Sequence, residues 1–234
     1  MDLLAQLVAE PDRAAILLDI DGVLAPIVER PEDAAVPAET RREVSRLAAR
    51  YALVACVTGR AGDDARRVIG LDGIPVAALH GLELEPEAEA WRGRVQAFAA
   101  TVDWPVEDKG IAVSFHYRTA PDREAARAEL ERVAERARGE GLVARFGRLV
   151  LEVLPPVEAN KGTAVRRLLA EHGLDRALYA GDDTTDLDAF RALEPLELGV
   201  RVAVASDEGP RELREAADLV VADPAELLGL LRSL

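Results

Sequence analysis

The chain has 234 residues, 49% of them hydrophobic and 31% charged, which is typical of a globular protein that buries its own core. A formal net charge of -14, with no basic patch interleaved with aromatic residues, argues against binding to nucleic acid or to an anionic lipid surface. The single Cys56 permits no internal disulfide, the amino-terminal residues carry acids where a signal peptide is basic, and no uncharged apolar stretch approaches the ~18 residues that span a bilayer. We therefore expect a cytoplasmic monomer that binds neither nucleic acid nor membrane.

A short amphipathic helix is predicted for residues 1–13, and the apolar run after it ends in two acids. The run starts at Ala14, continues into Asp19 and Asp21, and turns at Gly22, as expected of a strand buried on both faces. Residues two apart on a strand point to the same side, so we expect both carboxylates to face one place. Like charges that close are unfavourable without a cation, so the pattern indicates a metal site.

Helices and strands alternate in the next segment. A helix is predicted from Pro37 to Tyr51, and apolar runs follow at residues 53–57 and 76–79. The first run ends in Thr58, Gly59 and Arg60, and the second ends in His80 and Gly81. This alternation predicts a parallel sheet with helices on both faces.

The pattern changes between about residues 85 and 157. We predict a helix containing Trp91, Val95 and Phe98, a strand within residues 111–118, and a long helix from Pro121 to about Arg138. Two short apolar runs, residues 142–146 and 149–155, are separated by Gly147 and Arg148, which suggests antiparallel pairing.

The alternation of helices and strands resumes with a helix from Lys161 that ends before Gly173. Strands are then predicted at residues 177–180, 199–204 and 219–222. The expected fold is α/β: a doubly wound, Rossmann-like parallel-sheet core at residues 1–84 and 158–234, with a smaller α+β domain inserted at residues 85–157.

Chemistry-bearing residues cluster where the core strands end or the next helices begin, which is where ligands collect in open parallel sheets. They are Asp19 and Asp21, Thr58, Lys161, and Asp182, Asp183 and Asp186. Carboxylates hold a hard divalent cation such as Mg2+, while a lysine and a hydroxyl complement a phosphate group.

Four motifs, DIDGVL, VTGR, NKG and GDDTTD, occur in an order that resembles the haloacid dehalogenase-like phosphatases. The resemblance implies that Asp19 attacks phosphorus to form an aspartyl-phosphate, while Asp21 acts as acid and then as base. Thr58 and Lys161 would bind the phosphate oxygens. Mg2+ would sit between Asp19, Asp182 and the backbone carbonyl of Asp21, supported by Asp183 or Asp186. The insertion falls where this superfamily carries a cap domain that closes over the site.

Three further stretches, LHGLE at 79–83, KGIAVSFHYR at 109–118 and LVLEVLPPVEANKG at 149–162, resemble the trehalose-6-phosphate phosphatases. By that resemblance the partner is a small-molecule sugar phosphate, trehalose 6-phosphate, which is hydrolysed to trehalose and phosphate. The implied substrate-binding residues are Lys109, His116, Arg118 and Glu152 on the cap side, and Arg60, His80 and Glu83 on the core side. A packed core histidine is an alternative interpretation of His116.

The chain departs from this family's usual pattern at Val23, Leu154 and Leu187, which stand where a threonine, a basic residue and an acid are usual. Another sugar phosphate, such as sucrose 6-phosphate or a glycosylglycerate phosphate, therefore stays open as the substrate. A phosphomutase and a non-catalytic sugar-phosphate sensor are further alternatives.

Overall fold

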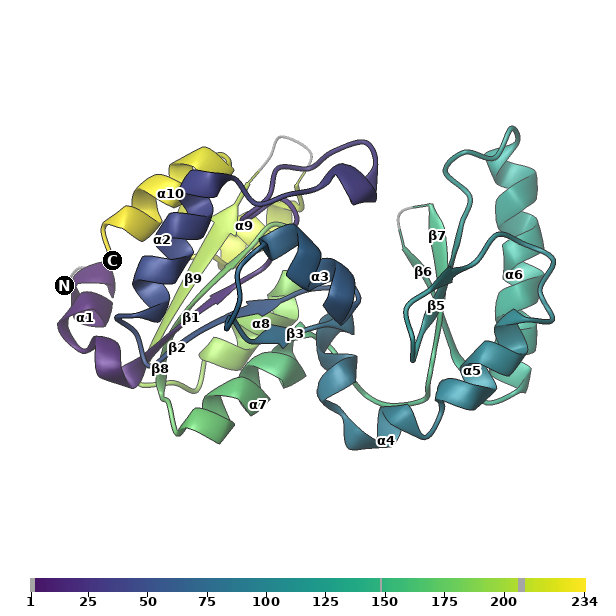
Figure 1. Cartoon of the computed structure of the whole chain (residues 1–234), viewed down its shortest axis with the longest axis horizontal. Coiled ribbons are helices and arrows are strands. Elements are labelled where there is room, and N and C mark those ends of the chain that lie inside the picture. The colour runs from purple at the N-terminus through teal and green to yellow at the C-terminus, as the bar shows by residue number, and fades with distance from the viewer. Residues whose placement is uncertain (1–2, 148, 206–208) are drawn as a thin grey trace. The chain divides into compact units, whose positions relative to one another are not determined.

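The structure is a computed structural model that describes residues 3–147, 149–205 and 209–234. The chain forms two compact units (Figure 1). The core unit comprises Met1–Gly81 and Ala159–Leu234, and the cap unit comprises Leu82–Glu158. Among the described residues, no helix is long and apolar enough to cross a membrane.

The core unit alternates helices and strands as expected. Its first segment contains α1 (Leu3–Ala9), β1 (Ala14–Leu18), α2 (Ala38–Ala48), β2 (Leu53–Val57), α3 (Gly62–Ile69) and β3 (Val76–Ala77). Its second segment contains α7 (Lys161–His172), β8 (Arg176–Gly181), α8 (Asp186–Leu193), β9 (Leu198–Val204), α9 (Arg211–Ala216), β10 (Leu219–Val221) and α10 (Pro224–Arg232). The sheet order is β10-β9-β8-β1-β2-β3, and the strands pair in parallel. The predicted α/β fold is thereby confirmed.

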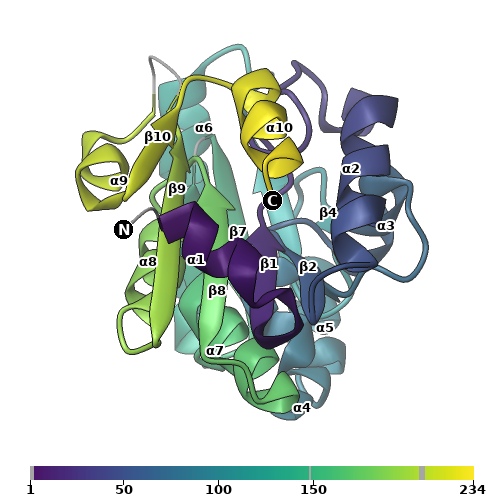
Figure 2. The same cartoon turned by 90° about the vertical axis from the view of Figure 1, so that its left-hand side faces the viewer.

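Helices cover both faces of the core sheet, with α2 and α10 on one side and α7 and α8 on the other (Figures 1 and 2). Every residue of β1 and β2 is buried. On the first face, Leu47 of α2 and Leu231 of α10 share a cluster with Leu18 of β1. Because all strands are parallel, their carboxyl ends meet at one edge, where the candidate residues gather.

The cap unit is a smaller α+β layer. It contains α4 (Pro86–Glu89), α5 (Arg92–Ala99), β4 (Glu107–Asp108), β5 (Val113–His116), α6 (Arg123–Gly139), β6 (Val143–Gly147) and β7 (Val150–Leu154). The sheet order is β4-β5-β7-β6, and each pair is antiparallel. The two runs predicted to pair, β6 and β7, do so. Arg148, predicted as part of their connection, lies outside the described residues, as do Met1 and Asp2 of the predicted first helix.

One face of the cap sheet is apolar and the other is polar. Phe115 of β5 and Leu151 of β7 are fully buried and pack with Phe98 of α5 and Leu130 of α6. The register aligns a row of alternate residues across the four strands: Glu107, Ser114, Glu152 and Arg145. Since side chains alternate along a strand, this row lies on the face opposite Phe115 and Leu151.

Local geometry accounts for where several elements begin and end. The long cap helix starts at Arg123, because the Asp122 side chain accepts from the backbone N–H groups of Glu124 and Ala125. Strand β3 is shorter than the predicted run, since Leu79 and His80 have φ angles of 49° and 56° and leave the extended conformation. They begin η3 (Leu79–Leu84), the 3-10 segment where the chain passes from the core unit to the cap unit.

Candidate active site

Asp19 and Lys161 form a buried ion pair at the carboxyl end of β1. The backbone N–H of Asp19 donates to the carbonyl of Ala180 in β8 at 3.0 Å, which extends the sheet contact by one residue. Lys161 is the first residue of α7, and its Nζ lies 2.6 Å from Oδ2 of Asp19. The two side chains are 7% and 2% exposed, so little solvent screens the pair.

Asp186 is fully buried and accepts four hydrogen bonds. Its Oδ1 receives Nζ of Lys161 at 2.7 Å and the hydroxyl of Tyr179 at 2.6 Å. Its Oδ2 receives the backbone N–H groups of Asp182 and Asp183, each at 2.9 Å. One side chain thus fixes the lysine and the loop after β8 together.

Asp19, Asp182 and Asp186 form a carboxylate cluster, each offering an oxygen within 4.8 Å of the others. Burial raises the pKa of Asp19 above its ordinary value, with Lys161 opposing and the charge of Asp186 adding to the shift. Burial and the charges of Asp19 and Asp186 raise the pKa of Asp182 to about 8. Burial alone would lower the pKa of Lys161, but the charges of Asp186 and Asp19 raise it, so Lys161 stays an ammonium. A single ammonium leaves the cluster short of positive charge.

The residues of this cluster fit a hard divalent cation. All three side chains are carboxylates, the ligand type that Mg2+ prefers, and Asp19 and Asp182 keep acceptor capacity while four hydrogen bonds occupy the lone pairs of Asp186. The backbone after β1 also approaches Asp182 closely: Gly22 has a φ angle of 74°, and a Cβ there would collide with the Asp182 carboxylate. The chain therefore holds the donors together at a cost in charge repulsion that a cation would remove.

Asp21 follows the end of β1, where strand alternation no longer determines the direction of its side chain. Regular strand geometry ends at Leu18, before either acid. The Asp21 carboxylate receives Nε and Nη2 of Arg60, both at 2.7 Å. Arg60 also contacts Asp64 through Nη1. Burial would lower the pKa of Arg60, but its bonds to Asp21 and Asp64 raise it, and the guanidinium stays charged.

Thr58 and His80 are joined by backbone contacts at the ends of β2 and β3. The N–H of His80 donates to the carbonyl of Thr58 at 2.8 Å, and the buried Thr58 Oγ1 accepts from the N–H of Arg60 at 3.2 Å. The His80 ring lies against Gly59, where a Cβ would be 2.7 Å from Nε2. Both predicted residues therefore lie in the core unit, beside the strand ends.

Two predicted residues are not members of the carboxylate cluster. Asp183 is exposed, and its Oδ1 accepts from the N–H of Thr184 at 2.7 Å. Glu83 is exposed in η3 and belongs to the cap unit.

A second polar cluster lies on the cap sheet. Nζ of Lys109 is 3.0 Å from Oε1 of Glu152, and Nε2 of His116 is 2.7 Å from Oε2 of Glu107. Lys109 also lies 3.9 Å from Glu107, which links the two pairs. His116 is half exposed, so it is not the packed core histidine of the alternative interpretation. Arg118 is exposed two residues beyond the end of β5.

Comparison with known proteins identifies the family. A family model described as Trehalose-phosphatase matches residues 17–105 and 96–224 of the chain. The chain belongs to the trehalose-phosphatase family.

Relatives and solved structures agree with this assignment. The chain is 36% identical to a "Probable trehalose-phosphate phosphatase" of Sinorhizobium fredii over 86% of its own length and 82% of that protein. It is 31% identical to "Trehalose 6-phosphate phosphatase RA3" of Zea mays over 97% of its length and 71% of that protein. A crystal structure titled as a trehalose-6-phosphate phosphatase related protein superposes with a TM-score of 0.72 at 26% identity, covering 93% of this chain and 95% of that one. The chain is therefore a phosphatase, a phosphoric monoester hydrolase.

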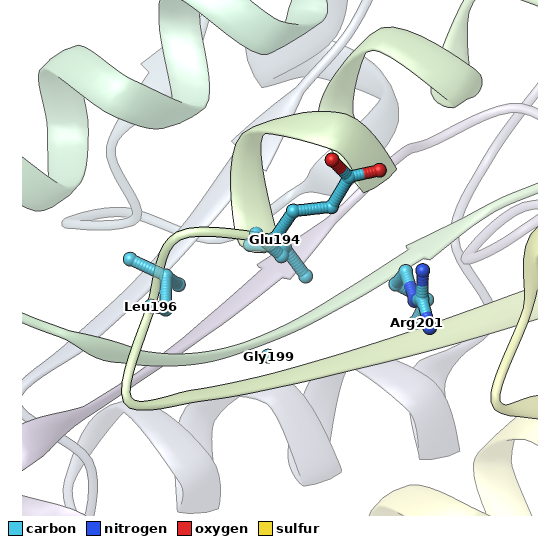
Figure 3. A pocket seen from close by; sticks show the side chains of 5 residues that line it. Glu194, Leu196, Gly199 and Arg201 are labelled. Carbon is cyan, nitrogen blue, oxygen red and sulfur yellow. The ribbon is translucent and has the colours of Figure 1, made fainter.

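The described residues of the core unit in this trehalose-phosphatase family member line two cavities of interest. One, of about 180 Å3, reaches Gly22 and Asp182 and is otherwise lined mostly by apolar residues: Pro26, Ile27, Val204, Ala222 and Pro224. The other, of about 230 Å3, lies where α8 is followed by β9 and is lined by Glu194, Leu196 and Arg201 among others (Figure 3). Arg201 is already held by both oxygens of Asp218, at 2.9 and 2.7 Å. Only the first cavity adjoins the carboxylate cluster.

Tyr179 and Glu107 contact this phosphatase's polar clusters but were not predicted from the sequence. Tyr179 lies in the apolar run of β8, where its hydroxyl gave no signal apart from its place three residues before Asp182. Glu107 lies on β4, a two-residue strand without alternating apolar residues. Its position two residues before Lys109 was the only available clue.

Proposed function

We propose that this phosphatase hydrolyses trehalose 6-phosphate to trehalose and inorganic phosphate. The observation that carries the proposal is the buried Asp19, paired with Lys161 within the carboxylate cluster of a trehalose-phosphatase family member. We place the reaction in the cytoplasm, in keeping with a single cysteine that is a buried free thiol.

The proposed chemistry proceeds in two steps. An oxygen of Asp19 attacks phosphorus and the bond to the sugar oxygen breaks, while Asp21 gives that oxygen a proton. Asp21 then takes a proton from water, which attacks the aspartyl-phosphate and releases phosphate. Lys161 has three N–H donors and uses two on Asp19 and Asp186, so the third is available for a phosphate oxygen. Thr58 offers its hydroxyl to another phosphate oxygen.

Asp21 needs to be oriented for both proton transfers. Arg60 holds its carboxylate through two hydrogen bonds, which leaves the remaining lone pairs for the leaving oxygen and for water. We therefore assign Arg60 to this positioning role in addition to the substrate contact expected from the sequence.

Asp19 and Asp182 would hold a Mg2+ ion, with Asp186 fixing the loop that carries Asp182. When bound, Mg2+ would supply positive charge against the phosphate oxygens and the clustered carboxylates. The backbone carbonyl of Asp21 is a further proposed ligand.

Sugar recognition is assigned to the polar cluster of the cap sheet and to further polar residues of both units. The proposed set is Lys109, His116, Arg118 and Glu152, with Arg60, His80 and Glu83. Paired donors and acceptors such as Lys109 with Glu152 suit a ligand rich in hydroxyl groups, and sites of this kind reject ligands that leave a group unpaired.

The test measures phosphate release from trehalose 6-phosphate, sucrose 6-phosphate and glucose 6-phosphate, with Mg2+ and with a chelator. We expect a strong Mg2+-dependent preference for trehalose 6-phosphate, and no turnover by Asp19→Asn. Preference for sucrose 6-phosphate would assign another sugar to the same chemistry. Full activity of Asp19→Asn would refute the assignment of Asp19 as the nucleophile.

A further inference from the structure

A tyrosine buried in the core sheet contacts the carboxylate cluster of the candidate active site through its hydroxyl. Tyr179 of β8 has no exposed surface, and its hydroxyl donates to Oδ1 of Asp186 at 2.6 Å. Its ring meets Phe190 of α8 edge-on, with the ring centroids 6.1 Å apart and an interplanar angle of 83°. The ring is therefore held from the side while the hydroxyl faces the cluster.

The Asp186 carboxylate has about four lone-pair sites, and four donors occupy them. Asp186 is thereby saturated by protein groups, whereas Asp19 and Asp182 retain acceptor capacity. This difference makes Asp186 a support for the cluster. Its geometry depends on the balance of the two donors on Oδ1, which are Lys161 and Tyr179.

The phenol can act only as a donor in this environment. Burial and the charge of Asp186 hold the pKa of Tyr179 well above its ordinary value, so the hydroxyl keeps its proton. Without that hydroxyl, Oδ1 would retain Lys161 alone, and the ammonium would be drawn from Asp19 toward Asp186.

We propose that Tyr179 is a positioning residue of this phosphatase. Its hydroxyl holds Asp186 so that Lys161 stays on Asp19 and the backbone of Asp182 stays in place for a cation. The inference rests on the proposed roles of Asp19 and Asp182 and is independent of which sugar is the substrate.

Tyr179→Phe removes the hydroxyl and keeps the ring. Tyr51→Phe is the matched control, because Tyr51 is also buried in the core unit and its hydroxyl lies 3.4 Å from the carbonyl of Leu234, in a bond apart from the cluster. Each variant is assayed with para-nitrophenyl phosphate, which needs no sugar recognition, and Mg2+ binding is measured by calorimetry.

For Tyr179→Phe we expect Mg2+ affinity and kcat each to fall about tenfold, as is usual when a residue that orients a metal ligand is lost, while KM changes less than about twofold. Tyr51→Phe should change neither quantity. A Tyr179→Phe protein with a lower Tm but unchanged kcat and Mg2+ affinity would overturn the proposal and leave Tyr179 a packing residue. A wild-type preference for another sugar phosphate would not affect this result, since neither readout uses the sugar.

A second measurement covers the case in which Tyr179→Phe does not fold. Tyrosine at 179 is replaced by 3-fluorotyrosine, which keeps the ring and the hydroxyl, and its fluorine resonance is followed during Mg2+ titration. We expect the resonance at 179 to shift and the same label at 51 to stay unchanged. An unchanged resonance at 179 would contradict the coupling to the cation site.

Discussion

Gly22 lets the backbone after β1 lie directly against the Asp182 carboxylate. Its φ angle of 74° strains any other L-residue, and a Cβ would collide with that carboxylate. We predict that Gly22→Ala destabilises the core unit by roughly 1–2 kcal/mol and also weakens Mg2+ binding, because Asp182 is displaced. Urea unfolding and calorimetric Mg2+ titration measure the two effects.

Gly73 offers the control for this substitution. It has a comparable φ angle of 81°, but a Cβ there would meet nothing within 4 Å. Gly73→Ala should lower stability by a similar amount and leave Mg2+ affinity unchanged. If both variants lost Mg2+ affinity equally, general destabilisation and not contact with Asp182 would be the cause.

At the residue scale, the sequence assigned five aspartates to a metal site, and among the described residues three of them form the carboxylate cluster. Asp19, Lys161, Asp182 and Asp186 lie together because parallel strands and the helices after them meet at one edge. Asp21 faces Arg60 because strand geometry ends before it, and no periodicity describes a loop. Such partners depend on contacts between residues far apart in the chain.

Lys161 is the first residue of helix α7, so the N-terminal cap of this helix affects the position of Lys161. The Asn160 side chain accepts from the N–H of Thr163 at 2.9 Å, and the Thr163 hydroxyl accepts from the N–H of Asn160 at 3.0 Å. We predict that Asn160→Ala costs about 1 kcal/mol of stability and lowers kcat, because the N–H of Thr163 loses its acceptor and Lys161 shifts. Denaturant unfolding and turnover of an aryl phosphate check this.

Asp122→Ala removes a comparable cap from α6 in the cap unit, where the side chain accepts from two backbone N–H groups. It should cost a similar amount of stability and leave aryl phosphate turnover intact. Equal loss of kcat in the two variants would contradict the prediction that the α7 cap positions Lys161.

The polar face of the cap sheet allows sugar recognition to be tested apart from phosphoryl transfer. Oε1 of Glu152 in β7 accepts from Nζ of Lys109 at 3.0 Å and lies 3.5 Å from the hydroxyl of Ser114. We predict that Glu152→Ala raises KM for the sugar phosphate about tenfold or more, since hydroxyl partners are lost, and changes KM for an aryl phosphate little. Steady-state kinetics on both substrates decides it, and equal changes would remove Glu152 from the sugar site.

At the element scale, long periodic segments were predictable and short ones were not. Strands β1 and β2 and helices α6 and α7 follow from buried runs, caps and the glycine at 173. Strand β4 has two exposed acidic residues and exists only because β5 pairs with it, so nothing local to the sequence indicated it.

For the whole molecule, the carboxylate cluster predicts how stability depends on pH. In the unfolded chain Asp carboxyls titrate near pH 4, whereas in the metal-free fold the pKa of Asp182 is raised to about 8, by burial first and neighbouring charges next. The folded state therefore binds protons more tightly, and this stabilisation is complete below pH 4 and lost as pH rises through 8. We predict that the Tm of the metal-free protein falls between pH 6 and pH 8.

Mg2+ should reverse that fall, because it binds the deprotonated carboxylates. The gain in Tm on adding Mg2+ is expected to be larger at pH 8 than at pH 6, and Asp182→Asn should reduce the difference. Differential scanning calorimetry with Mg2+ and with a chelator measures it. A gain in Tm that is independent of pH would contradict the raised pKa.

The order of helices and strands predicted the parallel core and the inserted domain, since strands that alternate with helices form parallel sheets and adjacent short strands pair antiparallel. The strand order with β1 between β8 and β2 could not be derived in the same way. It depends on which segments, distant in sequence, bury the most apolar surface together.

The cap unit lies in the sequence between the two segments of the core unit, and this has a consequence for synthesis on the ribosome. Strand β1 can pair with β2 once residue 57 has emerged, but its other edge stays open until β8 is made at residues 176–181. The cap unit is complete at residue 158 and can fold during that interval. A nascent chain stalled there carries a finished cap unit and a strand of apolar residues whose second edge is unpaired, which is the stage most exposed to aggregation.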